Sequence, residues 1–352
     1  MPAAPNDLLL ETVERFLRTE IDPHAAELDL QPAKAPPVDL VAMLNDLGLL
    51  GLSAMDERAT RPESLARLVF AIARHDASVA AVVLHALVGD FARRLVHDAA
   101  IPEGLAAFAL HELGDIALEE GKPRCQTALR DGRVTGKKRA VALGPCARVF
   151  AIACAKDGEA RLAWTTASRV AVGPPLGLLG LRALPVADVE LDGCPAKAVS
   201  PLGAAELTAL LATWGLLSAS AACGTASAAL AAARSYSADR RQGGRAIADY
   251  DAVKLLLAPN EAAVDSAQAG LESAATGQAD DRDSAWARRV LAARLPATRA
   301  AVQATLDAVQ VMGGYGYMRD YGQEKRFRDA VTLSLCPMDG QRLALFLAHH
   351  VA

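Results

Sequence analysis

The feature that most constrains this chain is a long stretch without charge. Residues 207–233, between Glu206 and Arg234, hold no charged side chain. A stretch of this length is long enough to cross a bilayer. Its content is mostly Ala, Ser, Thr and Gly, however, and these residues insert poorly compared with Leu, Ile, Phe and Val. The sequence therefore predicts a helix buried on all sides within a helical bundle, and no membrane span.

The composition supports a helical core. The chain has 352 residues, of which 52% are hydrophobic and 22% charged, so two or three domains with sizeable cores are expected and global disorder is excluded. Only 4% of the residues are aromatic. Packing must therefore rely on Ala, Leu and Val, which favours helix against helix.

The charge balance and the cysteines narrow the class of protein. The net charge of −4 argues against a general nucleic-acid or anionic-membrane binder, which would be basic. Six cysteines are present without a C-x-x-C pair or a neighbouring His cluster, so we expect buried free thiols rather than disulfides or a metal site. The first 16 residues lack a basic region followed by a long apolar run. We therefore expect a cytoplasmic location.

The hydrophobic period changes twice along the chain. Residues 1–111 show helical spacing, residues 112–202 hold short alternating runs broken by Gly, Pro and Asp, and residues 203–352 are helical and rich in Ala. Long helices are expected at about 204–238, 251–277 and 284–312, with a shorter one near 339–350. The predicted class is α+β, mostly α: an N-terminal helical domain, a central antiparallel β domain and a C-terminal four-helix bundle.

Three motifs stand out from this background. One is the string Gln310–Tyr317, with paired glycines after a long helix, followed by the charged string Glu324–Ala330. Paired glycines let backbone N–H groups approach a ligand, although a glycine helix cap with a tight turn explains the string equally well. The second motif places three arginines within residues 240–245, which could grip a diphosphate or form a solvated helix end. The third, residues 136–139, is a basic turn typical of a hairpin corner.

Taken together, the order and spacing of these motifs resemble the acyl-CoA dehydrogenase family over essentially the whole chain. Residues 45–52, 176–182 and 187–195 add further similar segments. The resemblance implies FAD as cofactor and an acyl-CoA thioester as substrate, from which a glutamate base and the flavin remove hydrogen at Cα and Cβ. It also implies an oligomer and an electron-transfer flavoprotein as partner.

The resemblance also assigns cofactor-binding residues. Arg240 would contact the FAD diphosphate. The other positions assigned to the cofactor are Gln242, Gln310, Val311, Met312, Gly313, Gly314 and Gln341.

The sequence departs from the family pattern at the catalytic base. Counting from the Arg-Asp-Ala string places Pro337 where the family has its glutamate. A minority of members carry the base on an earlier helix, and the matching position here is Trp214. Neither residue can accept a proton. Asp339 is the only carboxylate near the usual position, and displacement along the loop would misplace proton transfer.

The contacts to the flavin ring are altered as well. Ala140 replaces the aromatic that flanks the ring, and Ala142 replaces a hydroxyl that bonds to it. The loop aligned with residues 112–118 has lost its Ser-Asp end. In the arginine motif Gly243 replaces a Phe, and Asp251 replaces a Gln and is a poor neighbour for a diphosphate.

Three hypotheses follow from this pattern. In the family each FAD lies across a dimer interface, with the ring and base on one subunit and the arginine and Gln-x-x-Gly-Gly segments reaching over from the other. A subunit that completes the FAD site of a catalytic paralogue explains both what is kept and what is lost. The alternatives are a self-sufficient flavoenzyme with altered chemistry and a cofactor-free binding or scaffold protein with the same fold.

Overall fold

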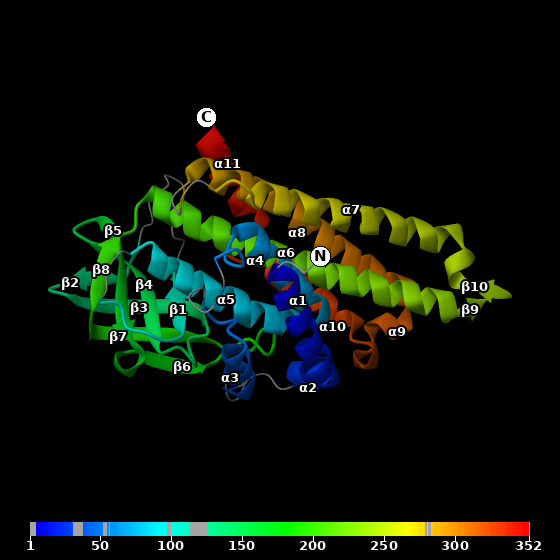
Figure 1. Ribbon diagram of the computed structural model, residues 1–352, viewed down its shortest axis with the longest axis horizontal. Coiled ribbons are helices and arrows are strands. Elements are labelled where there is room, and N and C mark those ends of the chain that lie inside the picture. Colours follow the sequence, from blue (N-terminus) through cyan, green and yellow to red (C-terminus); the bar gives the residue numbers. More distant parts are fainter. Residues whose placement is uncertain are drawn as a thin grey trace.

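The computed structural model describes residues 5–30, 38–51, 55, 57–96, 100–112, 125–278, 280 and 283–351. Helices lie at both ends of the described chain and a sheet lies between them (Figure 1). The N-terminal helices are α1 (Pro5–Phe16), α2 (Ala25–Leu30), α3 (Val38–Asp46), α4 (Pro62–His75) and α5 (Ala77–Arg94). Pro62 opens α4, and the Asp76 carboxylate caps α5 by accepting from the Ser78 and Val79 N–H groups at 2.7 and 3.0 Å.

The sheet is mixed rather than antiparallel. Its strands are β1 (Ala106–Ala109), β2 (Ala128–Arg130), β3 (Arg133–Ala142), β4 (Val149–Lys156), β5 (Glu159–Thr166), β6 (Ala171–Pro175), β7 (Val186–Pro195) and β8 (Ala198–Pro201). They follow the order β6-β7-β3-β2-β4-β5-β8, with β1 joined to β4. The pairs β1–β4 and β2–β4 are parallel and the others antiparallel.

The mixed sheet corrects the expectation of a purely antiparallel one. Strand β1 is a short, fully buried run with the sequence Ala-Ala-Phe-Ala, and it lies inside the segment expected to be helical. Such a run has no alternating period that would separate it from a buried helix. The β2–β3 hairpin between β1 and β4 supplies the long connection that a parallel pair requires.

The C-terminal helices form a bundle around α6 (Ala204–Asp239). Its other elements are α7 (Asp251–Ala275), α8 (Ser284–Met312), α9 (Gly314–Tyr317), α10 (Gln323–Ser334) and α11 (Gly340–Val351), with the two-stranded hairpin β9 (Arg241–Gln242) and β10 (Arg245–Ala246). The helices α4, α5, α7, α8 and α10 all pack against α6. Within the described residues α6 alone is long and apolar enough to cross a membrane, yet 78% of its most apolar part is buried in the protein. The prediction of a buried core helix is therefore confirmed.

The six cysteines are free, as expected. Three of them are buried, and Cys125, Cys146 and Cys336 are half-buried.

Candidate functional site

The arginine motif and the paired-glycine motif meet at one end of the bundle. Arg240 follows the last residue of α6, and Tyr315 follows the end of α8. The Arg240 guanidinium carbon lies 5.7 Å from the centre of the Tyr315 ring, which also packs against Tyr236 and Tyr321. We call these four residues the arginine–tyrosine cluster. Figure 1 shows this end of the molecule, with α9 near the β9–β10 hairpin.

The residues assigned to FAD at this end of the bundle divide into two kinds. Val311 and Met312 are buried, with exposed fractions of 7% and 5%, and anchor the end of α8 in the core. The polar members and the glycines are exposed: Arg240, Gln242, Gln310, Gly313 and Gly314. These exposed residues therefore present a guanidinium, two amides and glycine backbone to the outside, and the buried Val311 and Met312 hold the end of α8 in place.

The presence of Gly243 in place of the family's Phe has a local structural reason. Gly243 and Gly244 form the turn of the β9–β10 hairpin, with φ of 57° and 87°. Positive φ at both central residues suits a two-residue hairpin and favours glycine. The Tyr250 hydroxyl lies where a side chain at position 243 would begin, and it donates to the Gln242 carbonyl at 2.9 Å.

Gln341 lies far from this cluster within one chain. It is the second residue of α11, whose first residue, Gly340, lies beside Leu295 of α8. Leu295 and Gln310 are separated by roughly 22 Å along α8, at about 1.5 Å per residue. The structure therefore brings Arg240, Gln242 and residues 310–314 together and leaves Gln341 apart.

Both positions at which the family carries its catalytic base hold buried residues in this chain. Pro337 is buried in the loop between α10 and α11. Arg294 holds that loop, donating to the carbonyl oxygens of Ser334, Cys336 and Met338 at 2.9, 2.6 and 2.7 Å. Asp339, the remaining carboxylate, caps α11 by accepting from the Gln341 and Arg342 N–H groups at 2.9 and 3.1 Å.

Trp214 lies in a buried cluster of aromatic and histidine rings. The sequence did not predict this cluster. Its ring centre is 5.4 Å from that of His85, 6.0 Å from Phe108 and 5.8 Å from His111. Burial lowers the pKa of His85 to about 4, although a 2.7 Å hydrogen bond between Nδ1 and the Ala81 carbonyl opposes the shift. Burial also lowers the pKa of His111. In the sequence, a single histidine in an apolar run resembles an ordinary core residue. Nothing in the sequence therefore marked His85 and His111 as members of this ring cluster.

The positions aligned with the family's flavin-ring contacts carry side chains that offer few contacts to a flavin ring. Ala140 is exposed in a bulge of β3 with φ of 48°, and its N–H donates to the Asp188 carboxylate at 2.9 Å. Ala142 is half-buried. Behind them Lys138 is fully buried and paired with Glu112. Burial alone would raise the pKa of Glu112, but Lys138, together with hydrogen bonds from Thr127 and Gln126, outweighs burial and the pKa is lowered. The rest of the aligned loop, residues 113–118, lies outside the described residues.

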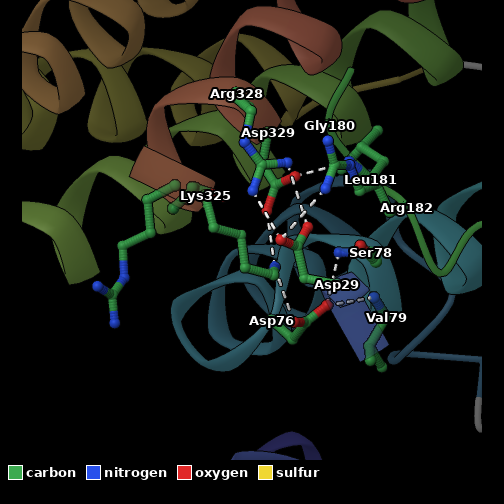
Figure 2. A network of polar contacts seen from close by, with 12 residues as sticks. Asp29, Asp76, Ser78, Val79, Gly180, Leu181, Arg182, Lys325, Arg328 and Asp329 are labelled. Carbon is green, nitrogen blue, oxygen red and sulfur yellow. Dashed lines mark hydrogen bonds and ion pairs between the residues drawn. The ribbon is translucent and has the colours of Figure 1, made fainter. Parts of the chain in front are cut away.

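The charged string Glu324–Ala330 forms a junction between three parts of the chain. Lys325 of α10 lies 2.9 Å from Asp76, the cap of α5, and 2.8 Å from Asp329 (Figure 2). Asp329 accepts from the Leu181 N–H at 2.6 Å. Burial opposes the charge on Lys325, but the two carboxylates outweigh it and raise its pKa. These residues therefore hold the fold together rather than bind a ligand.

A second pair extends this junction. Arg328 binds both carboxylate oxygens of Asp29 in α2, at 3.2 and 2.7 Å. It also donates to the Leu179 carbonyl at 2.8 Å, while Arg182 lies 3.8 Å from Asp29. A side chain at Gly180 would collide with the backbone of Arg328, so this close approach requires glycine.

The site residues fit one half of FAD and not the other. The exposed guanidinium of Arg240 and the exposed backbone of Gly313 and Gly314 suit a diphosphate. The ring positions Ala140 and Ala142 supply neither an aromatic face nor a hydroxyl, and Pro337 and Trp214 supply no base.

Comparison with known proteins agrees with this fold and these motifs. Residues 5–94 match the N-terminal domain model of acyl-CoA dehydrogenase, and residues 209–336 match the C-terminal domain model. The chain is 29% identical to benzylmalonyl-CoA dehydrogenase of Aromatoleum aromaticum, covering 97% of this chain and 96% of that protein. It is 28% identical to cyclohexane-1-carbonyl-CoA dehydrogenase of Geobacter metallireducens, covering 98% and 96%.

A solved structure shows the same architecture. Butyryl-CoA dehydrogenase of Megasphaera elsdenii superposes with a TM-score of 0.86 at 18% identity, covering 100% of this chain and 99% of that one. FAD is the cofactor of the family, as the resemblance implied. With both domain models matched in order along the chain, this protein belongs to the acyl-CoA dehydrogenase family.

Proposed function

We propose that this chain is the non-catalytic subunit of a heteromeric acyl-CoA dehydrogenase and completes the FAD site of a catalytic paralogue. The paralogue supplies the flavin-ring contacts and the glutamate base. This chain supplies the diphosphate contacts through Arg240, Gln242, Gln310, Gly313 and Gly314. The complex oxidises an acyl-CoA in the cytoplasm and passes electrons to an electron-transfer flavoprotein.

One observation carries the proposal: the two halves of a family FAD site have different fates in this chain. Pro337 and Trp214 are buried at the base positions, and neither accepts a proton. Arg240 and Gln310 remain exposed and assembled at the other end of the bundle. Selective loss of one half is what a subunit serving only its neighbour's cofactor would show.

A self-sufficient flavoenzyme receives less support. Asp339 would have to be its base, but both of its hydrogen bonds to backbone N–H groups serve the start of α11. Such bonds hold the carboxylate in place as a helix cap.

The test is to co-express the chain with a paralogue that carries the glutamate, then measure FAD retention and acyl-CoA oxidation. Arg240→Ala should weaken FAD binding in the complex tenfold to hundredfold, because it removes a charge-assisted bond worth about 1.5–3 kcal/mol. Arg241→Ala is the matched control, since Arg241 is the adjacent exposed arginine and has no assigned role. It should leave FAD binding within twofold of the unsubstituted complex.

Three outcomes would contradict the proposal. If the Arg240→Ala complex bound FAD as tightly as the unsubstituted complex, Arg240 would not be a contact of the FAD diphosphate. Turnover by this chain alone, with stoichiometric FAD, would establish a self-sufficient enzyme. A chain that neither joins a paralogue nor affects its FAD would instead be a cofactor-free member of the fold.

A further inference from the structure

A cavity of about 410 Å³ lies away from both parts of the candidate site. It is bounded by the start of α4, the second half of α5, the first half of α6 and the turn between α7 and α8. We call it the α4–α6 pocket; its lining residues used below are Leu87, Phe91, Thr213, Leu216, Leu217 and Gln278. Its lining contains no member of the arginine–tyrosine cluster, and neither Trp214 nor His85.

The pocket has an apolar floor. Leu87 and Phe91 come from α5, and Leu216 and Leu217 from α6; each is at most 5% exposed. Small-molecule sites have volumes of about 300–1,000 Å³ and combine such a floor with a few converging polar groups. The pocket is within this range.

Thr213 supplies one of these polar groups. Threonines inside the long helices normally satisfy their hydroxyl by donating to the carbonyl four residues earlier. Thr225, Thr298 and Thr305 do so, at 2.8, 3.1 and 3.0 Å. Thr213 is 8% exposed and lines the pocket, but its Oγ1 has no hydrogen-bond partner among the described residues.

Gln278, which also lines the pocket, supplies a second group. It lies in the turn after α7, and its buried Nε2 likewise has no partner within the described part of the chain. Leaving a buried polar atom unpaired costs about 1–3 kcal/mol, so two in one cavity are unusual. Both atoms can donate a hydrogen bond, and an acceptor oxygen between them would satisfy both.

The charges in the lining do not select a charged ligand. Arg61 and Arg94 are balanced there by Glu57 and Glu63. We propose that the α4–α6 pocket binds a small neutral carbonyl compound, a carboxamide with a short aliphatic chain. Its carbonyl oxygen accepts from Thr213 and Gln278, and its chain packs against the apolar floor. The proposal does not depend on the proposed function, because the two sites share no residue.

Calorimetric titration of the purified chain with hexanamide tests this, with hexanoate as the charged counterpart. We expect saturable binding of hexanamide and binding of hexanoate at least tenfold weaker. Thr213→Val keeps the shape and removes the hydroxyl, and it should weaken hexanamide binding roughly threefold to tenfold. Thr225→Val is the matched control on the same helix and should leave hexanamide binding unchanged.

A second variant keeps the test decisive if the core substitution disturbs folding. Gln278 lies in a turn rather than in the core. The Gln278→Leu substitution should weaken hexanamide binding to a similar degree. The absence of hexanamide binding, or equal binding by Thr213→Val, Gln278→Leu and Thr225→Val, would overturn the proposal. Equal binding of hexanoate and hexanamide would overturn the assignment of a neutral ligand.

Discussion

Asp339 and Trp214 occupy the two positions where this chain could have kept a catalytic role. Asp339 accepts two backbone hydrogen bonds at the start of α11 and lies 3.4 Å from the Arg342 side chain. Trp214 packs edge-on against His85 and Phe108, with its indole N–H unpaired among the described residues. Each residue is thus explained by the packing of this chain.

Asp339→Ala should therefore affect stability and not turnover. Loss of a helix cap costs about 1 kcal/mol, which urea denaturation of the chain would detect. The rate of the complex with its paralogue should be unchanged. Asp251→Ala is the comparison, because Asp251 is 91% exposed at the start of α7 and should cost only a few tenths of a kcal/mol. A complex inactivated by Asp339→Ala would identify Asp339 as the base.

The lowered pKa of His85 leads us to expect that the stability of the chain depends on pH. Its folded pKa of about 4 lies below the value of 6.5 expected when unfolded, so its neutral form is favoured in the folded state. This contribution is fully present above pH 6.5 and is lost as the pH falls towards 4, because the unfolded chain takes up the proton first. The loss amounts to about 3 kcal/mol at most. Urea denaturation between pH 7 and pH 4.5 should show a shallower slope for His85→Gln than for the unsubstituted chain; equal slopes would contradict the assignment.

At the scale of elements, the junction around α10 explains why this helix carries so many charges. Lys325 joins α10 to the cap of α5, Asp329 joins it to the Leu181 backbone, and Arg328 joins it to α2 (Figure 2). Helices and sheet are thereby fixed relative to one another by buried ionic contacts as well as by apolar packing.

Lys325→Met should strongly destabilise the chain. It leaves the carboxylates of Asp76 and Asp329 buried without their cation, and breaking a buried pair costs about 3–5 kcal/mol. Lys137→Met removes the exposed partner of Glu190 and should cost less than about 1 kcal/mol. Thermal and urea denaturation would measure both. A small, similar loss in the two variants would contradict the role of the junction.

At the scale of the whole molecule, the residues that the family resemblance assigns to FAD are divided between distant places. The arginine–tyrosine cluster lies at the end of α6, whereas Gln341 lies at the start of α11, beside Leu295. One chain does not bring these two places together, and the proposed function assigns the other part of the FAD site to a second subunit.

The purified chain should accordingly be an oligomer that holds little FAD by itself. Ala140 and Ala142 remove a ring contact and a hydrogen bond, each worth roughly 1 kcal/mol. Light scattering should give a mass above that of one chain at micromolar concentration, and flavin absorbance should be substoichiometric. A monomer, or a fully yellow preparation, would count against this.

The sequence by itself determined the helix–sheet–helix order, the family and the buried position of α6. These follow from local properties: hydrophobic period, the absence of charge over residues 207–233, and motifs at fixed spacing. It also predicted that the base is missing from its usual position, because Pro337 cannot accept a proton in any fold.

The tertiary structure decided everything that depends on residues far apart in the chain. It placed β1 in a mixed sheet, because a four-residue buried run has no distinctive period. It brought His85 to Trp214 and Asp76 to Lys325, pairs separated by more than a hundred residues. It also showed that Asp339, the candidate base, caps α11, a role that depends on the N–H groups that packing places around its carboxylate.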